Sequence, residues 1–254
     1  MTTSAILLRR IDFGDYDLII TFFSLKSGKI SLIAKSAKKS VKRFGGMLEL
    51  FSVLDIVYSR GRKKSLPVLQ EASLIKPFSE IRTDIKKTAY ASYWAELISK
   101  HIEEGAVQKE VFRLFKYVLS ALDTGKIPDG ALSILFQLRF MLIYGLRPNL
   151  AQCSLCKTEI DSLQEDSFAC DLAGGGILCS RCRKTSGKSL KLSRGTVKQL
   201  LWIQNREPAT AARIRIAPKS IEEGLFFLES FVQYHLGKEL KSLNFLKQIR
   251  SGIA

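Results

Sequence analysis

The spacing of apolar and polar positions changes once along the chain, and the change separates two kinds of structure. Up to about residue 76, short runs rich in β-branched and aromatic residues alternate with turn signals. Examples are the runs 6–13, 18–25 and 47–59, a pattern typical of β-strands. These runs leave no room for crossover helices. We therefore predict five short strands that form a small barrel or sandwich.

After Pro77 the apolar positions recur with helical spacing. Proline and glycine residues mark where helices start and stop. The predicted helices are 79–105, 109–125, 128–149, 193–205 and about 220–236. A capping box formed by Ser220 and Glu223 is expected at the start of the last one. The fold class is therefore α+β, with a β-rich first part and a helical remainder.

All five cysteines lie in one stretch between two of these helices. Four of them form two C-x2-C pairs separated by 22 residues: Cys153, Cys156, Cys179 and Cys182. Two such hooks can direct four sulfurs to the corners of a tetrahedron, which is the arrangement of a zinc site. Disulfide bonds are the alternative, but they are rare in cytosolic proteins. Cys170 has no neighbour at this spacing, and we interpret it as a bystander, with replacement of one of the four ligands as the alternative.

We expect the zinc ion to be structural rather than catalytic. Four thiolates close the coordination shell, whereas a catalytic zinc keeps one position open. From Cys153 to Cys182 five acidic residues outnumber two basic ones, so this segment is a poor surface for phosphate. One Zn²⁺ per chain is predicted, and its removal should reduce the folded helical signal because metal binding is coupled to folding.

Positive charge dominates the rest of the chain. Lysine and arginine number 40 against 24 aspartate and glutamate residues, a net charge of +16 that predicts an anionic partner such as nucleic acid. Two basic segments of the β-rich part are the candidate contacts. They contain Lys35, Lys38, Lys39, Lys42, Arg43 and Phe44, and then Arg60, Arg62, Lys63 and Lys64. Cations can follow a phosphate backbone and an aromatic ring can stack on a base. The alternative is a solvated loop that only aids solubility.

The sequence contains no recognisable catalytic constellation. It has neither a phosphate-binding loop of the GxxxxGK[ST] type nor a carboxylate cluster with metal-ligand spacing, so we expect a non-enzymatic protein. No apolar run approaches the about 20 residues that cross a bilayer. The first residues lack the charged start and apolar core of a signal peptide. We therefore expect a cytoplasmic location without a membrane partner.

Several segments together resemble the bacterial RecO-type recombination mediators. The resemblance runs over most of the chain and is carried, in order, by ILLRRIDFGDYDLIITFFSLKSGKISLIAKSAKK, KRFGGMLELFS, AYASYWAEL, YGLRPNLAQCSLC, GGGILCSRC and YHLGKELKSLNFL. Two positions depart from the family pattern, because Ser36 and Lys157 stand where glycine is usual. Neither departure removes a predicted ligand or basic loop residue. Many relatives lack a complete set of cysteines, so the intact hooks place this chain among the metal-binding members.

The resemblance implies an OB-fold β-barrel at 1–78 and a helical domain in two parts, 79–152 and 183–254, with the zinc module 153–182 inserted between them. It also implies a recombination mediator in DNA repair that binds single- and double-stranded DNA, anneals complementary strands and helps to load recombinase. The implied partners are RecR, RecA and the C-terminal tail of the single-strand DNA-binding protein, SSB.

An acidic SSB tail would need a basic rim around an apolar groove on the helical domain. Arg139, which stands in an otherwise apolar stretch, is a candidate for that rim. The alternative is an arginine that is paired within the helical core or exposed on one face. A different class of function is an RNA-binding or transcription-associated protein with OB and zinc modules. A metal-dependent nuclease is disfavoured, since no suitable carboxylate cluster is present.

Overall fold

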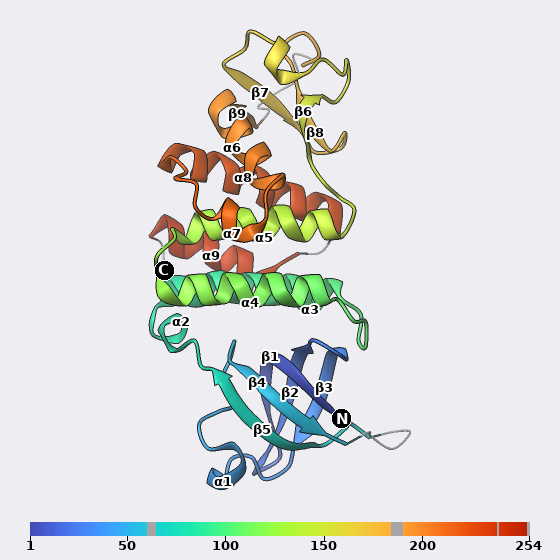
Figure 1. The fold of residues 1–254 in the computed structure, drawn as a ribbon, viewed down its shortest axis with the longest axis vertical. Helices are drawn as coiled ribbons and strands as arrows, with labels where there is room; N and C mark the ends of the chain where they lie inside the picture. Colours follow the sequence, from blue (N-terminus) through green and yellow to red (C-terminus); the bar gives the residue numbers. More distant parts are fainter. Residues whose placement is uncertain (60–64, 184–189, 238, 253–254) are drawn as a thin grey trace. The chain divides into compact units, whose positions relative to one another are not determined.

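A computed structural model describes residues 1–59, 65–183, 190–237 and 239–252, without the side chains of residues 41 and 42. The chain forms two compact units, which are described separately (Figure 1). The first unit combines Met1–Thr124 with Leu240–Ala254, and the second comprises Gly125–Glu239. The predicted combination of an N-terminal sheet with later helices is confirmed.

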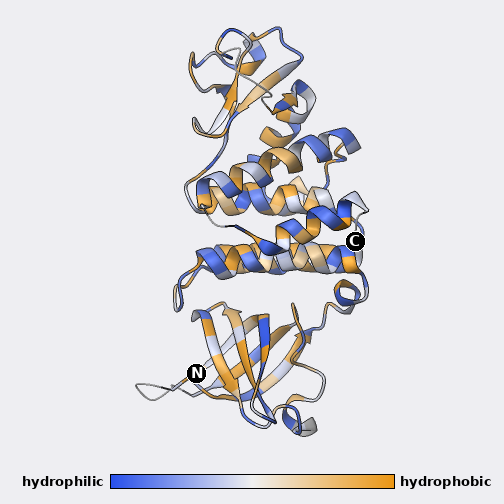
Figure 2. Cartoon of the chain, turned by 180° about the vertical axis from the view of Figure 1, so that it is seen from behind, coloured by the Kyte–Doolittle hydropathy of each residue, from blue (hydrophilic) through white to orange (hydrophobic). Residues whose placement is uncertain are grey.

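The first unit begins with an antiparallel sheet of five strands, as the alternation of residues predicts. Its strands are β1 (Thr2–Phe13), β2 (Asp17–Ser24), β3 (Gly28–Ala34), β4 (Val53–Tyr58) and β5 (Leu69–Lys76). Their order is β3-β2-β1-β4-β5, and the short helix α1 (Val41–Phe44) lies between β3 and β4 in the chain. Every second residue, such as Ile20, Phe22 and Leu32, enters a common core. Figure 2 shows the resulting bands of hydrophobic and hydrophilic colour along the strands.

The prediction of a closed barrel is wrong, because the sheet is open. The two edge strands β3 and β5 form no ladder with each other; only an isolated bridge joins Ile33 to Val68, the residue before β5. The other end of the β3 edge is already occupied, since Lys29 accepts a hydrogen bond from the Gly105 amide at 2.8 Å. Gly28 allows this approach, because a Cβ atom there would lie 2.1 Å from the Ala106 carbonyl oxygen.

Helices complete the first unit. They are α2 (Ser79–Thr83), α3 (Ile85–His101), α4 (Lys109–Thr124) and α9 (Lys241–Ser251). The single helix predicted at 79–105 is divided, because the Asp84 carboxylate caps α3 by accepting hydrogen bonds from the amides of Lys86 and Lys87 at 2.8 and 3.1 Å. Helix α9 packs on α3. The Glu96 carboxylate of α3 accepts a hydrogen bond from the Ser242 amide at 2.8 Å. This bond gives a partner to an amide of the first turn of α9, which has none within its own helix.

The second unit combines helices with a small four-stranded sheet. Its helices are α5 (Asp129–Ile143), α6 (Arg194–Gln204), α7 (Pro208–Ala211) and α8 (Pro218–Leu236). Its strands are β6 (Asn149–Cys153), β7 (Ser167–Asp171), β8 (Gly176–Leu178) and β9 (Lys191–Ser193), in the order β6-β8-β7-β9, and a 3₁₀ turn, η1 (Ile160–Ser162), follows β6.

The predicted capping box of the last long helix is wrong. Helix α8 begins two residues earlier than expected, at Pro218, and its N-cap makes no side-chain hydrogen bond. The Glu223 carboxylate instead accepts hydrogen bonds from the Ser193 and Thr196 hydroxyls at 2.8 and 2.6 Å. The motif therefore links α8 to the start of α6 rather than closing its own helix.

Candidate metal centre and nucleic-acid interface

The four hook cysteines converge on one point. Cys153 ends β6 and Cys179 follows β8, so the parallel pairing of these two strands places the two hooks side by side. The sulfur atoms of Cys153, Cys156, Cys179 and Cys182 all lie within 4.8 Å of one another. The Sγ atoms of Cys156 and Cys179 are 3.8 Å apart, close to the about 3.8 Å that zinc–sulfur bonds of about 2.3 Å require in a tetrahedron. This cluster could therefore hold a metal ion.

The backbone of each hook turns back on itself. In the first hook the Lys157 amide donates to the Cys153 carbonyl at 3.0 Å, and Lys157 has a φ of 59°. In the second, the Cys182 amide donates to the Cys179 carbonyl at 3.2 Å. The Glu165 carboxylate holds the second turn from outside by accepting hydrogen bonds from the Ser180 amide at 2.9 Å and its hydroxyl at 2.9 Å. We call residues 149–182 the cysteine module.

The thiols of this cluster differ in acidity because their hydrogen-bond partners differ. Hydrogen bonds from Thr158 lower the pKa of Cys156 to about 6. Hydrogen bonds with the neighbouring thiols of Cys179 and Cys156 raise the pKa of Cys182 to about 12. Thiolates so close together repel one another, so all four can ionise only if a cation shares the site. The donor set thus fits a thiophilic divalent ion.

Cys170 stands outside the cluster, on β7. Burial, followed by the negative charge of Glu223, raises the pKa of its thiol to about 12. Its sulfur is not among the four that lie within 4.8 Å of one another. The structure therefore separates Cys170 from the four cysteines that converge.

The first basic segment, residues 35–44, folds against the turn between β1 and β2; we call it the basic loop. The Lys38 amide donates to the Tyr16 carbonyl at 3.1 Å, and the Ser36 amide donates to the Asp17 carboxylate at 2.7 Å. Ser36 has a φ of 54°, a left-handed conformation that glycine adopts more readily. These contacts fix the backbone of the loop.

The side chains of the basic loop have nearby partners yet stay near the solvent. Lys38 forms an ion pair with Asp12 at 2.9 Å, and the Lys39 ammonium lies 3.4 Å from the centre of the Tyr16 ring. Arg43 donates to the Lys35 carbonyl at 2.8 Å. Ion pairs at the surface contribute little energy, so a phosphate can compete for these cations.

Phe44 does not fit its predicted role. Its ring is only 3% exposed and belongs to the core of the sheet, so it is not available to stack on a base. Tyr16, which is 45% exposed and holds Lys39 above its ring, is the accessible aromatic residue beside the loop. Sequence reasoning missed it because Tyr16 lies about twenty residues before the lysines. The available signal was the sequence DYD, residues 15–17, which places an aromatic residue in the turn between two predicted strands.

The remaining predicted contacts of this surface lie outside the described residues. They are the side chain of Lys42 and the residues Arg60, Arg62, Lys63 and Lys64. Their role in binding stays a prediction.

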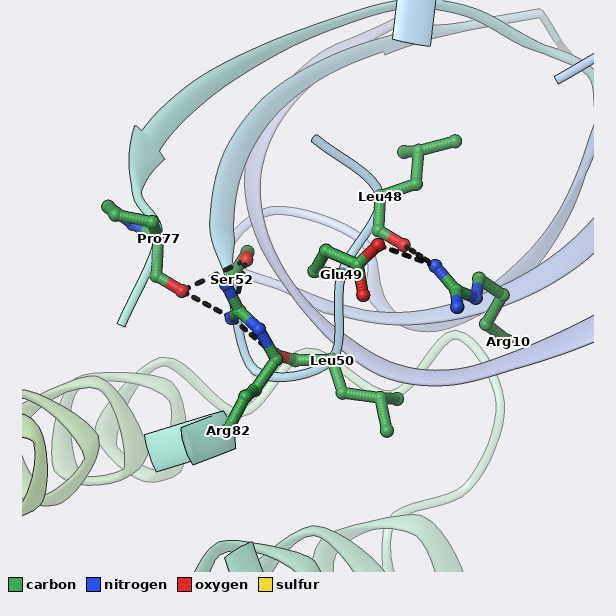
Figure 3. A network of polar contacts seen from close by, with 7 residues as sticks. All are labelled: Arg10, Leu48, Glu49, Leu50, Ser52, Pro77 and Arg82. Carbon is green, nitrogen blue, oxygen red and sulfur yellow. Dashed lines mark hydrogen bonds and ion pairs between the residues drawn. The ribbon is translucent and has the colours of Figure 1, made fainter. Parts of the chain in front are cut away.

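Two other arginines of the first unit are used to hold its backbone. Figure 3 shows Arg10 donating to the Leu48 carbonyl at 2.8 Å and pairing with Glu49 at 2.9 Å. In the same view Arg82 donates to the Pro77 carbonyl at 2.6 Å. Arg10 also lines a pocket of about 300 Å³ with Lys38. Some cations of this unit therefore hold its backbone, whereas those of the basic loop lie at the surface.

Arg139 lies on α5 of the second unit. Its Nη2 atom is 3.5 Å from the Ile203 carbonyl near the end of α6, and its buried Nε atom has no partner among the described residues. Burial lowers the pKa of its guanidinium; the charge of Glu207 raises it, and that of Arg147 lowers it. Arg147 lines a separate pocket of about 310 Å³ with Leu150 and Leu201. Whether Arg139 forms the rim of a groove stays a prediction.

Among the described residues, no helix combines the length and the apolar character needed to cross a membrane. The comparisons with known proteins agree over nearly the whole chain. Two family models match: Recombination protein O N terminal over residues 1–78 and Recombination protein O C terminal over residues 82–244.

Curated relatives named DNA repair protein RecO match nearly the full length. That of Desulfatibacillum aliphaticivorans is 47% identical over 251 residues, covering 98% of this chain and 97% of the relative. The relative from Desulfosudis oleivorans is 44% identical and covers 98% of both chains. That of Syntrophus aciditrophicus is 32% identical, covering 98% of this chain and 95% of its own. With both family models matched in order and relatives aligned over nearly their full length, the chain belongs to the RecO family of recombination proteins.

Proposed function

We propose that this protein is a non-enzymatic, DNA-binding mediator of recombination in DNA repair. It binds single- and double-stranded DNA, anneals complementary strands and helps to load recombinase onto single strands coated with SSB. Membership of a family whose curated members are named DNA repair proteins supports the role in repair. The partners proposed with it are RecR, the SSB C-terminal tail and RecA, at the nucleoid.

The basic loop is the observation that carries the DNA-binding part. Its backbone is fixed to the β1–β2 turn, while its lysine side chains lie at the surface. Ammonium groups in such a position neutralise phosphates and release their counterions, which favours binding at low salt. Neutralising phosphates on two strands at once lowers the repulsion that opposes annealing. The loop therefore supplies the chemistry that an annealing protein needs.

The cysteine module has a different part in this proposal. Zn²⁺ held by Cys153, Cys156, Cys179 and Cys182 would have four sulfur ligands and no open position, so it would stabilise the fold and take no part in a reaction. The module carries more acidic than basic residues, so it is a poor surface for phosphate, and the proposed DNA contacts lie on basic surfaces outside it.

Strand annealing is the test. Complementary oligonucleotides coated with cognate SSB are mixed with and without the protein, and duplex formation is followed by fluorescence. Faster annealing without strand cleavage is the expected result. Tight DNA binding without any acceleration would contradict the mediator function, and preferential binding of RNA of equal length at equal salt would favour a function on RNA.

A further inference from the structure

The four converging residues of the cysteine module differ in their access to solvent. Cys153, which ends β6, and Cys179, which follows β8, are 1% and 0% exposed. Cys182 is half-buried, whereas Cys156 is exposed. Cys156 lies in the turn after β6, beside Leu155, which is 61% exposed. A small molecule dissolved in water therefore reaches Cys156 more readily than the other three.

The exposed cysteine has a second sulfur within reach. Its Sγ atom lies 3.8 Å from that of the buried Cys179 on the other hook. The Thr158 hydroxyl lies 3.2 Å from the same Cys156 Sγ atom and can donate a hydrogen bond to it. A disulfide bond places its sulfurs about 2 Å apart, and Cys156 stands in a turn rather than in a strand, so a small local movement joins the two. An accessible thiolate beside a second cysteine is the arrangement of a redox-sensitive site.

We propose that Cys156 is the site at which a peroxide oxidises this protein, and that Cys179 then forms a disulfide with it and opens the cysteine module. The Cys156 thiolate attacks one oxygen of hydrogen peroxide, the O–O bond breaks and hydroxide leaves, which gives a sulfenic acid. The Cys179 thiolate next attacks the Cys156 sulfur, the S–S bond forms and a second hydroxide leaves. Each sulfur loses one electron, and the two peroxide oxygens gain them.

The disulfide takes two of the four predicted zinc ligands. Cys153 and Cys182 alone supply half of a closed tetrahedral shell, so the ion is released. Because binding of a structural zinc is coupled to folding, the module then loses its fold and becomes accessible to proteases. The first unit contains none of the cysteines and keeps its own core. A dithiol reductant reverses the change, since disulfide and sulfenic acid are both reducible.

Cys170 is the competing target in the same module. It is half-buried on β7, and burial, followed by the charge of Glu223, raises the pKa of its thiol to about 12. The thiolate is the form that attacks peroxide, so a thiol that stays protonated at neutral pH reacts slowly. Its sulfur also lies outside the cluster, and its oxidation would take no ligand from the metal.

The test uses the full chain loaded with zinc. It is treated with less than one equivalent of hydrogen peroxide in the presence of dimedone, which traps sulfenic acids, and mass spectrometry of its peptides locates the label. A parallel sample without dimedone is searched for disulfides, while a chromophoric chelator measures released zinc. Cys170→Ser is the control variant, because it removes the only thiol outside the cluster.

Dimedone should label Cys156 before any other cysteine. The sample without dimedone should gain the Cys156–Cys179 disulfide and lose one zinc ion for each disulfide formed. Limited proteolysis should then cut within residues 149–182, and a dithiol reductant with added zinc should restore resistance. Cys170→Ser should release zinc at the rate of the wild type.

Three results would overturn the inference. They are labelling that begins at Cys182 or Cys170, disulfide formation without loss of zinc, and zinc release that is slowed in Cys170→Ser. None of these measurements involves DNA, so a failure here is distinct from a failure of the proposed function.

Discussion

The cysteine module and the basic loop are both irregular segments beside a small sheet, yet they are ordered in opposite ways. In the module four side chains turn inward to one point, and their mutual repulsion demands a cation. In the loop the backbone is tied down through Ser36 and Lys38, while the ammonium groups stay near the solvent. The comparison suggests that a segment built for stability converges its side chains, whereas one built for binding secures its backbone and leaves its charges accessible.

Removing one inward-facing sulfur should have the largest effect. We expect Cys179→Ser to abolish stable metal binding and unfold the cysteine module, because zinc binding by four cysteines contributes about 10–16 kcal/mol to the folding of such modules. Metal content by mass spectrometry and limited proteolysis measure this. Cys170→Ser, a change of the thiol outside the cluster, should leave both unchanged.

The same variant also tests whether the cysteine module takes part in DNA binding. If the module serves only the fold, Cys179→Ser should leave the salt dependence of DNA binding by the first unit intact. A loss of affinity as large as that caused by removing the lysines of the basic loop would show that the module itself contacts DNA.

Removing the outward-facing charges should have an intermediate effect. The triple change of Lys35, Lys38 and Lys39 to Ala should reduce the log–log salt slope of single-strand binding by about 2, since each lost phosphate contact removes about 0.7. Thermal unfolding should change little, because the hydrogen bonds that fix the loop come from its backbone.

Asp12→Asn is the matched variant, and it should change DNA binding in the opposite direction. It removes the carboxylate that pairs with Lys38 and should strengthen DNA binding. An unchanged slope in the triple variant would show that the basic loop does not follow the phosphate backbone.

The smallest expected effect is on stability and comes from replacing Glu96 in the first unit. Although burial raises the pKa of Glu96, hydrogen bonds from Lys100 and Ser242 lower it more, so the net shift is downward. The stabilisation is therefore complete above the ordinary glutamate pKa of about 4.3 and is lost as the pH falls through the lowered value in the folded state. Glu96→Gln should reduce the free energy of unfolding by about 1 kcal/mol at neutral pH.

Urea unfolding at neutral pH and at about pH 4 measures this difference. The two proteins should differ less at the lower pH, because Glu96 is partly protonated there in the unfolded wild-type chain while it stays ionised in the folded one. Glu103→Gln, at an exposed position beyond α3, should behave as the wild type does. If the two glutamine variants lose equal stability, Glu96 does not hold the start of α9.

Local features of the fold could be predicted from the sequence. Alternating runs gave the five strands, and hook spacing identified the cysteines that converge. The two departures from the family pattern were also informative, because Ser36 and Lys157, which stand where glycine is usual, both have positive φ angles. In each case the signal lies within a few residues of the feature it predicts.

What failed depends on contacts between distant residues. The sheet is open, and Ala106 approaches one end of its β3 edge at Gly28, a contact that no local pattern encodes. The burial of Phe44 and the contact of Lys39 with Tyr16 likewise depend on how the loop folds back. The capping-box motif was present in the sequence, but its glutamate, Glu223, accepts hydrogen bonds from Ser193 of β9 and Thr196 of α6, which are distant in the sequence.

The return of α9 to the first unit has a consequence for synthesis on the ribosome. The face of α3 that α9 covers is made early, but α9 emerges only after the whole second unit has been translated. Until then the apolar surface that receives Leu243 and Leu246 stays open. A chain released early, before Leu240, would keep that surface permanently open. Such a product should be a preferred substrate for the proteases that clear unfinished proteins.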